Sequence, residues 1–139
     1  VLHVLDQEGW PERVIMHCFS GDAELARECV RHGSWLSFPG VLTFKNAERT
    51  RQALHATPVD KILVETDAPF LTPHPRRGKR NGPYLIAHTI RFLSEQLHWD
   101  EASCCEQLRR NAFVAYGGPW EDVHGVTPLQ LPASGEETR

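Results

Sequence analysis

Long apolar runs are missing from this sequence of 139 residues. No stretch approaches the roughly 18–20 consecutive apolar residues that a membrane-spanning helix needs, and no signal peptide is visible at the start of the chain. We therefore predict no association with a membrane. The 40% of hydrophobic residues is still enough to supply the core of one ordinary domain.

Cysteine pairs with the C-x-x-C spacing of metal or redox motifs are also missing. The four cysteines are Cys18, Cys29, Cys104 and Cys105, and adjacent cysteines such as the last two rarely bridge each other. The sequence therefore predicts free thiols in a reducing compartment, and we expect a cytoplasmic protein.

Several motifs that would name an activity directly are absent. There is no glycine-rich phosphate loop, no G-x-S-x-G context around Ser20 for an esterase, and no evident platform of aromatic residues for stacking bases. An excess of positive charge is missing too, because the formal net charge is −3. This charge argues against a protein that coats nucleic acid without specificity.

What the sequence does contain is a series of short apolar segments that alternate with amphipathic ones. Val1 opens the chain without a methionine, inside what reads as a helix already under way, so we expect a piece of a longer protein. The spacing is typical of βα units, which place parallel strands in one sheet. Three strands make either a small open sheet or part of a (β/α)₈ barrel, which needs ~250 residues. Strands are expected over residues 13–17, over 35–38 and from 62 to a stop before Pro69, and helices over 1–7, 22–32, 46–55, 83–97 and 101–116. Asp22 and Asp100 are the expected N-caps of the second and last helices, and the Gly-Gly-Pro that starts at Gly117 is expected to end the last one.

Three side chains fall where two of these strands end. His17 closes the first strand, and Asp67 closes the third, with Glu65 two residues before it on the same face. Imidazole and carboxylate are ligands of Zn, Mn or Mg-type ions, and α/β enzymes place such groups at the carboxyl ends of parallel strands. We take His17 and Asp67 as candidate metal ligands and Glu65 as a partner that orients one of them. A hydrogen-bonded strand-end histidine, a capped turn and a buried acid are the structural alternatives.

A cluster of cations follows the third strand. Arg76, Arg77, Lys79 and Arg80 lie within five positions, where they could bind phosphate or form a solvated charge run. Two single residues are further candidates for contact with a phosphate-bearing substrate: Lys45 after the second strand and His74 between two prolines. A single residue is a weaker signal than the cluster of cations. We assign no residue as a general acid, base or nucleophile.

Short motifs in this order resemble the TatD family of metal-dependent deoxyribonucleases. They are His-Cys-Phe-Ser-Gly at 17–21, Ser-Phe-Pro-Gly at 37–40 with Thr-Phe-Lys at 43–45, and Glu-Thr-Asp-Ala-Pro at 65–69. Thr-Pro-His-Pro at 72–75, Arg-Gly-Lys-Arg-Asn at 77–81 and Asn-Ala at 111–112 continue the resemblance. It implies an α/β fold, the C-terminal portion of a TIM-type (β/α)₈ barrel, over residues 1–117. Residues 118–139 match nothing and are expected to form a loose tail.

The resemblance also implies a chemistry. His17 and Asp67 match family metal ligands, and the family hydrolyses phosphodiester bonds in DNA with divalent ions (Mg, Mn or Zn), two of them in a complete protein. The other family ligands, an H-x-H pair, a glutamate and a further histidine, are absent. We therefore expect an incomplete enzyme that associates with itself or with a missing N-terminal half. The alternatives are an aminoacyl-tRNA ester hydrolase and a non-catalytic binding module.

Overall fold

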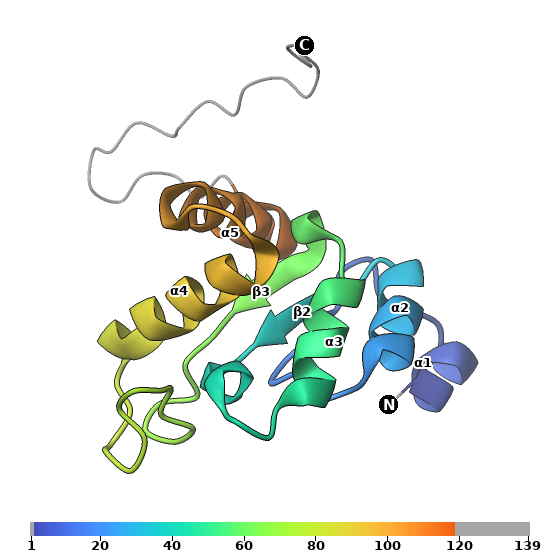
Figure 1. The fold of residues 1–139 in the computed structure, drawn as a ribbon. Helices are drawn as coiled ribbons and strands as arrows, with labels where there is room; N and C mark the ends of the chain where they lie inside the picture. The colour runs from blue at the N-terminus through green and yellow to red at the C-terminus, as the bar shows by residue number, and fades with distance from the viewer. Residues whose placement is uncertain (1, 119–139) are drawn as a thin grey trace.

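The structure is a computed structural model and describes residues 2–118 (Figure 1). Three short strands alternate with helices, which is the organisation expected from the sequence. No helix in the described part of the chain is long and apolar enough to cross a membrane. In chain order the elements are α1 (Leu2–Glu8), β1 (Ile15–Met16), α2 (Ala23–Arg31), β2 (Trp35–Phe38), the 3₁₀ turn η1 (Gly40–Thr43), α3 (Glu48–Ala56), the 3₁₀ turn η2 (Val59–Lys61), β3 (Ile62–Val64), the 3₁₀ turn η3 (Pro83–Leu85), α4 (Ile86–Leu97) and α5 (Glu101–Tyr116).

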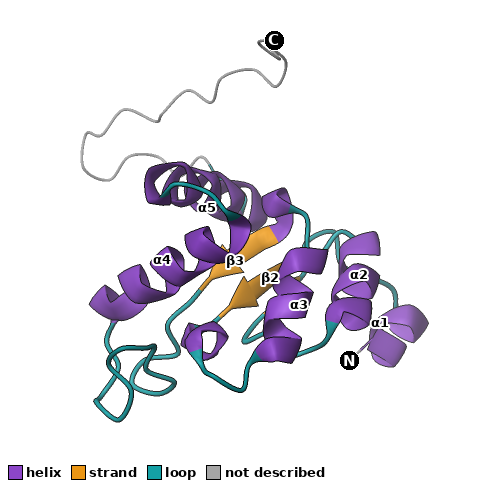
Figure 2. Ribbon diagram, viewed as in Figure 1, coloured by secondary structure: helices purple, strands orange, loops and turns teal. Residues whose placement is uncertain are grey.

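The three strands form one parallel sheet, as predicted from the βα spacing, and their order is β1-β2-β3. Figure 2 shows β2 and β3 side by side. Ile15 lies beside Trp35, and Ser37 lies beside Leu63. The hydrogen bonding continues past the end of β3, where the backbone N–H of Glu65 donates to the carbonyl of the β2 residue next to it at 3.2 Å. The carboxyl ends of all three strands therefore lie at the same end of the sheet, which is called its carboxyl edge below.

The second predicted strand, over 35–38, is confirmed, but the first and third are too long at their carboxyl ends. β1 ends before His17, and β3 ends before Glu65. Cys18 and Asp67 both adopt the left-handed backbone conformation, with φ of 49° and 53°, and this conformation turns the chain out of the sheet. The backbone N–H of Cys18 then donates to a side chain instead of to a neighbouring strand. The residues with polar chemistry therefore lie in turns beyond the strands.

One face of the sheet carries the main core. Leu36, Phe38 and Ile62 are at most 1% exposed and pack with residues of α2, α3 and α4, such as Leu54 and Leu93. Complete burial of such a side chain contributes about 1.5–3 kcal/mol. Figure 1 shows these helices beside β2 and β3. A smaller cluster on the other face joins β2 and β3 to the end of α5, and it consists of Trp35, Leu63 and Ala115 with Ile15 and Ala112 against it.

Two helices begin at the aspartates expected to cap them. Asp22 accepts a hydrogen bond from the backbone N–H of Leu25 at 2.9 Å, and Asp100 accepts one from the backbone N–H of Ser103 at 2.9 Å. These bonds satisfy donors that the first turn of a helix leaves unpaired. They favour the ionised carboxylate, so the pKa of each aspartate is lowered. Gly117 ends α5 with φ of 81°, also as predicted.

Asn111 of α5 fixes that helix against the sheet. Its side-chain amide donates to the carbonyl oxygens of Val59 and Ile62, both at 2.7 Å, and its carbonyl oxygen accepts from Gln107 at 2.8 Å. Asn111 is 2% exposed. Because a buried polar group is costly without partners, the two bonds to Val59 and Ile62 hold α5 at the start of β3, and the bond from Gln107 satisfies the carbonyl oxygen of Asn111.

Candidate metal centre

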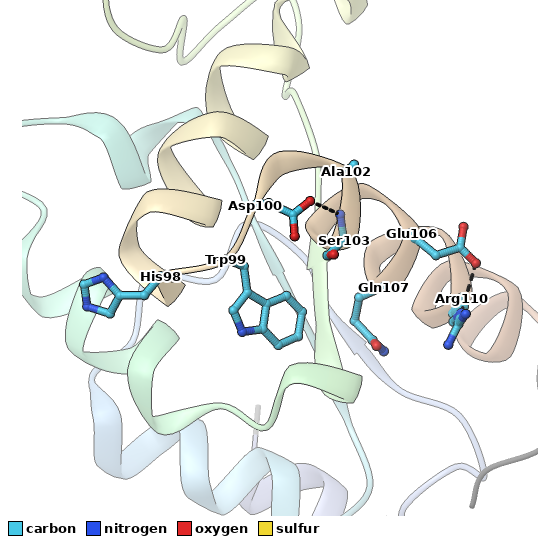
Figure 3. Close-up of a pocket in the computed structure, with 8 residues that line it drawn as sticks. All are labelled: His98, Trp99, Asp100, Ala102, Ser103, Glu106, Gln107 and Arg110. Carbon is cyan, nitrogen blue, oxygen red and sulfur yellow. Dashed lines mark hydrogen bonds and ion pairs between the residues drawn. The ribbon is translucent and has the colours of Figure 1, made fainter. Parts of the chain in front are cut away.

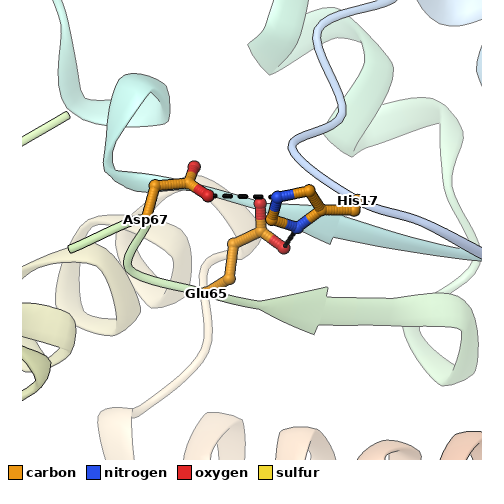
Figure 4. Close-up of side chains that lie close together, drawn as sticks. All are labelled: His17, Glu65 and Asp67. Carbon is orange, nitrogen blue, oxygen red and sulfur yellow. Dashed lines mark hydrogen bonds and ion pairs between the residues drawn. The ribbon is translucent and has the colours of Figure 1, made fainter. Parts of the chain in front are cut away.

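Three side chains converge at the carboxyl edge of the sheet: His17, Glu65 and Asp67 (Figure 4). His17 lies between the two acids. Its Nδ1 is 2.8 Å from Oε2 of Glu65, and its Nε2 is 3.3 Å from Oδ1 of Asp67. One ligand atom from each residue lies within 4.8 Å of the others. The structure thus brings together the histidine and the two carboxylates that the sequence singled out.

The pleat of the sheet explains why two of these side chains meet. Ile15 and Leu63 belong to the same face, in register with two β2 residues of that face. Successive side chains alternate between faces, so His17 and Glu65, each two residues further along, return to it. Asp67 reaches the cluster differently, because its left-handed backbone turns the chain back beyond β3.

Glu65 orients the other members of the cluster. One carboxylate oxygen is paired with His17, and the other accepts the backbone N–H of Cys18 at 2.6 Å. The hydrogen bond and charge of Glu65 raise the pKa of His17, with a smaller contribution from Asp67. A neutral His17 that donates from Nδ1 to Glu65 keeps its lone pair on Nε2, the atom that faces Asp67. Glu65 therefore has the contacts of a residue that fixes the ring of a ligand.

The geometry of His17 and Asp67 fits a divalent ion. Two ligand atoms that are each about 2.1 Å from one ion lie ~3.0–3.5 Å apart, and Nε2 and Oδ1 are 3.3 Å apart. The second oxygen of Asp67, Oδ2, is buried and has no hydrogen-bond partner, which is unusual for a charged group. A ligand set of imidazole nitrogen and carboxylate oxygen suits Zn or Mn, and Mg with more oxygen ligands.

Cys18 lies beside this cluster without the properties of a nucleophile. Burial and the neighbouring carboxylate of Asp67 raise the pKa of the thiol to about 11. The thiolate is the reactive and metal-binding form, so Cys18 remains a neutral thiol near pH 7. All four cysteines are free in the structure, as the sequence predicted.

The basic loop, residues 76–80, is held against the site by its own polar contacts. The side-chain amide of Asn81 donates to the carbonyl of Thr66, between the two acids, and to the carbonyl of Phe70, both at 2.6 Å. The hydroxyl of Thr72 donates to the carbonyl of Lys79 at 2.6 Å. Sequence reasoning gave Asn81 no role, since an asparagine before Gly82 reads equally well as a turn residue.

The cations of the basic loop lack acidic partners. Within residues 2–118, no carboxylate lies at ion-pair distance from Arg76, Arg77, Lys79 or Arg80, whereas most other arginines of that part are paired. All four are exposed. Unpaired, exposed cations on a loop tied to the site are available for an anion.

The remaining two candidates occupy different places. Lys45 is exposed and follows Phe44, whose ring lies 3.7 Å from the guanidinium of Arg77, so the backbone at Lys45 is next to a residue that contacts the basic loop. His74 does not join the metal cluster. Its backbone N–H donates to the hydroxyl of Thr43 at 2.9 Å, and it borders a separate hollow of about 300 Å³ against α4.

Another hollow lies away from the cluster, at the turn between α4 and α5 (Figure 3). Its volume is about 700 Å³. Its acids are already bonded, Asp100 to the start of α5 and Glu106 to Arg110 at 3.0 Å. Trp99 and Gln107 also contact the region of Ile62, at the amino end of β3. This hollow therefore belongs to the opposite end of the strand. Its lining is His98, Trp99, Asp100, Ala102, Ser103, Glu106, Gln107 and Arg110.

A parallel α/β sheet with imidazole and carboxylate ligands at its carboxyl edge defines the class of metal-dependent hydrolases. The family model described as TatD related DNase matches residues 1–117. The chain belongs to the TatD family, as the motifs predicted.

Relatives named as metal-dependent hydrolases support this membership. The chain is 47% identical over 120 residues to the uncharacterized metal-dependent hydrolase TatD of Mycobacterium tuberculosis, with 86% of this chain and 46% of the relative covered. It is 48% identical over 97 residues to the uncharacterized metal-dependent hydrolase YabD of Bacillus subtilis, with 68% and 38% covered. The chain thus spans about half the length of these relatives or less.

Solved structures show the same fold. A TatD homologue of Escherichia coli, YjjV, superposes with a TM-score of 0.76 at 26% identity, over 84% of this chain and 45% of that one. A TatD family hydrolase from Entamoeba histolytica superposes with a TM-score of 0.71 at 14% identity, over 82% and 46%. The predicted fold class, part of a TIM-type barrel with three parallel strands and their helices, is confirmed.

Proposed function

We propose that this chain is part of a metal-dependent deoxyribonuclease that hydrolyses phosphodiester bonds in DNA. The observation that carries the proposal is the approach of His17 Nε2 to Asp67 Oδ1 at 3.3 Å, beside a buried oxygen of Asp67 without a partner. The name of the matched family model supports the DNase activity, and the names of the relatives support metal-dependent hydrolysis in general. A structural histidine–carboxylate pair would not require the unpaired second oxygen.

The residues of the cluster have different roles in the proposed reaction. His17 and Asp67 hold a divalent ion, and Glu65 keeps the imidazole ring in position through Nδ1. When bound, such an ion polarises a phosphoryl oxygen and lowers the pKa of a water molecule. The cluster offers the ligands of one ion, and a second ion in the complete protein needs ligands from outside this chain.

The basic loop places the phosphate. Arg76, Arg77, Lys79 and Arg80 are exposed, unpaired and anchored next to Asp67 through Asn81. Arg77 is the best fixed of them, because its guanidinium lies on the ring of Phe44. A planar guanidinium held in this way can donate two hydrogen bonds to one phosphate.

A chimera tests the proposed reaction. Residues 1–117 replace the matched segment of the Mycobacterium relative, and the unchanged relative serves as the matched control. We expect metal-dependent cleavage of a labelled DNA oligonucleotide and no release of amino acid from charged tRNA. Release of the amino acid without cleavage of DNA would instead assign aminoacyl-tRNA ester hydrolysis. Metal binding without either reaction would indicate a binding module.

A further inference from the structure

Two aromatic side chains near the candidate metal centre are exposed to solvent. Phe70 is 72% exposed and Tyr84 is 77% exposed, which makes them the most exposed of the large hydrophobic residues in the described part of the chain. A ligand that covers these rings would gain the free energy of burying their apolar surface. Neither aromatic contributes to the two core clusters.

Asn81 joins the two segments that carry these rings. Its amide binds the carbonyls of Phe70 and Thr66, and its backbone N–H donates to the carbonyl of Pro69 at 3.1 Å. Phe70 therefore lies three residues beyond Asp67 on a fixed turn, and its backbone N–H donates to the Asp67 carbonyl at 2.8 Å. The start of η3, with Tyr84, is tied to the same turn.

The ring of Tyr84 folds back toward this junction. A Cβ placed on Gly82 would lie only 2.6 Å from Cε1 of Tyr84, so the ring covers the glycine. The φ of Gly82 is −151°, an extended conformation that any residue adopts. A side chain at Gly82 would therefore displace the ring of Tyr84, although the backbone conformation at this position would accept one.

We propose that Phe70 and Tyr84 bind nucleobases of unpaired nucleotides that lie next to the phosphate at the metal centre. The inference rests on the proposed function, because the unpaired cations of the basic loop supply the phosphate contacts. Exposed rings beside a phosphate-binding loop provide stacking surfaces for bases that are free of a duplex. Arg77 and Phe44 already occupy each other's faces, whereas Phe70 and Tyr84 are the exposed rings on the two segments that Asn81 joins. The structure thus supplies a stacking surface that no sequence motif indicated.

Binding of two labelled polymers to the purified chain tests this inference. One is a deoxythymidine decamer, and the other is a decamer of abasic sites with the same phosphates, both measured by fluorescence anisotropy in EDTA so that nothing is cleaved. The decamer with bases should bind more tightly. Phe70→Ala and Tyr84→Ala should each weaken its binding by about 5- to 100-fold, with binding of the abasic decamer unchanged. A uridine decamer should behave like the deoxythymidine decamer, since every base offers a stacking face.

Three matched variants make the outcome specific. Gly82→Ala should resemble Tyr84→Ala, because the new methyl group displaces the ring. Tyr84→Phe should keep the affinity, and Tyr116→Ala, at the far end of α5, should leave it unchanged. Circular dichroism of each variant checks that the fold is retained.

The results separate the inference from the proposed function. Equal binding of both decamers, with affinity that still falls as salt rises, would overturn the base-binding role and leave the phosphate loop in place. If both alanine variants still bind the deoxythymidine decamer more tightly than the abasic decamer, by the same factor as the parent chain, the assignment to Phe70 and Tyr84 would be overturned. No salt-dependent binding of either decamer would count against the phosphate loop itself and, with it, against this inference.

Discussion

His17 combines a high exposure with a fixed orientation. Its side chain is 70% exposed, whereas those of Glu65 and Asp67 are 15% exposed. An exposed ring normally samples several rotamers, but here both ring nitrogens are engaged. The buried acids fix the ring, and the exposed side leaves room for an ion and a substrate to approach.

His17→Ala and Asp67→Asn should each abolish most of the activity of the chimera in metal-replete buffer. We expect a loss of at least about 100-fold, because each change removes a ligand and not a packing group. Turnover rates and thermal melts of the same preparations measure the effect. His55→Ala, an exposed histidine of α3, is the matched control. A turnover rate near that of the parent chimera would remove the substituted residue from the site.

The double substitution Arg77→Ala with Lys79→Ala should weaken substrate binding more than metal binding. Each phosphate contact contributes a salt-dependent part of the affinity, so the slope of log affinity against log salt should become shallower by about 1–2. Oligonucleotide titrations between low and high salt give this slope. Arg27→Ala on α2, exposed and distant along the chain, should not alter it. An unchanged slope in the double variant would identify the basic loop as a solvated charge run.

At the scale of the elements, the positions of the strand ends matter more for the site than the lengths of the strands. β1 has two residues and β3 has three, yet both deliver a ligand to the same edge. The alignment depends on the buried register between Ile15, Trp35 and Leu36 and on the support of α5 behind β3. Small shifts of β3 would therefore move Glu65 and Asp67 away from His17.

Asn111→Ala should destabilise the fold by roughly 1–3 kcal/mol, because it removes the side-chain donor to the carbonyls of Val59 and Ile62, of which the bond to Ile62 is buried. Urea denaturation followed by circular dichroism measures the change. Gln107→Ala removes one hydrogen bond from a less buried position and serves as the matched control, with a smaller effect expected. Similar losses for both variants would contradict the special role of Asn111.

At the scale of the whole molecule, β1 and β3 each have an edge that pairs with no other strand of residues 2–118. An apolar hollow of about 480 Å³ lies beside β1 and includes Met16, His17 and Leu25 in its lining. Unpaired strand edges and apolar hollows favour association. The relatives are about twice as long as the matched segment, so we propose a docking partner that resembles their unmatched part, or a second copy of this chain.

The isolated chain should therefore have little or no nuclease activity. His17 and Asp67 alone leave a divalent ion mostly hydrated and weakly held, since a catalytic ion typically has about three protein ligands. A nuclease assay with Mg or Mn on the purified chain checks this, with His17→Ala as a control for contaminating enzymes. Addition of the separately produced unmatched part of the Mycobacterium relative should restore metal-dependent cleavage. Robust cleavage by the chain alone, lost in the His17→Ala control, would reveal ligands beyond these two.

The sequence alone determined the order of the elements, the helix starts at Asp22 and Asp100 and the end of α5 at Gly117. These features depend on local chemistry: apolar periodicity, side-chain caps and a glycine in the left-handed conformation. The sequence also indicated His17, Glu65 and Asp67, because parallel strands bring their carboxyl ends to one edge. The prediction of a tail at residues 118–139 falls almost wholly outside the described residues.

Only the tertiary structure decided how these residues meet. The side chain of Glu65 bonds both the ring of His17 and the backbone of Cys18, and Asn81 connects the basic loop to Thr66, which are contacts between segments distant in the chain. Local sequence patterns carry no information on such contacts, since the same asparagine or glutamate could belong to a simple turn or to a network of hydrogen bonds between distant segments. The left-handed turn at Asp67 likewise depends on its surroundings, because an aspartate adopts that conformation only where other contacts stabilise it.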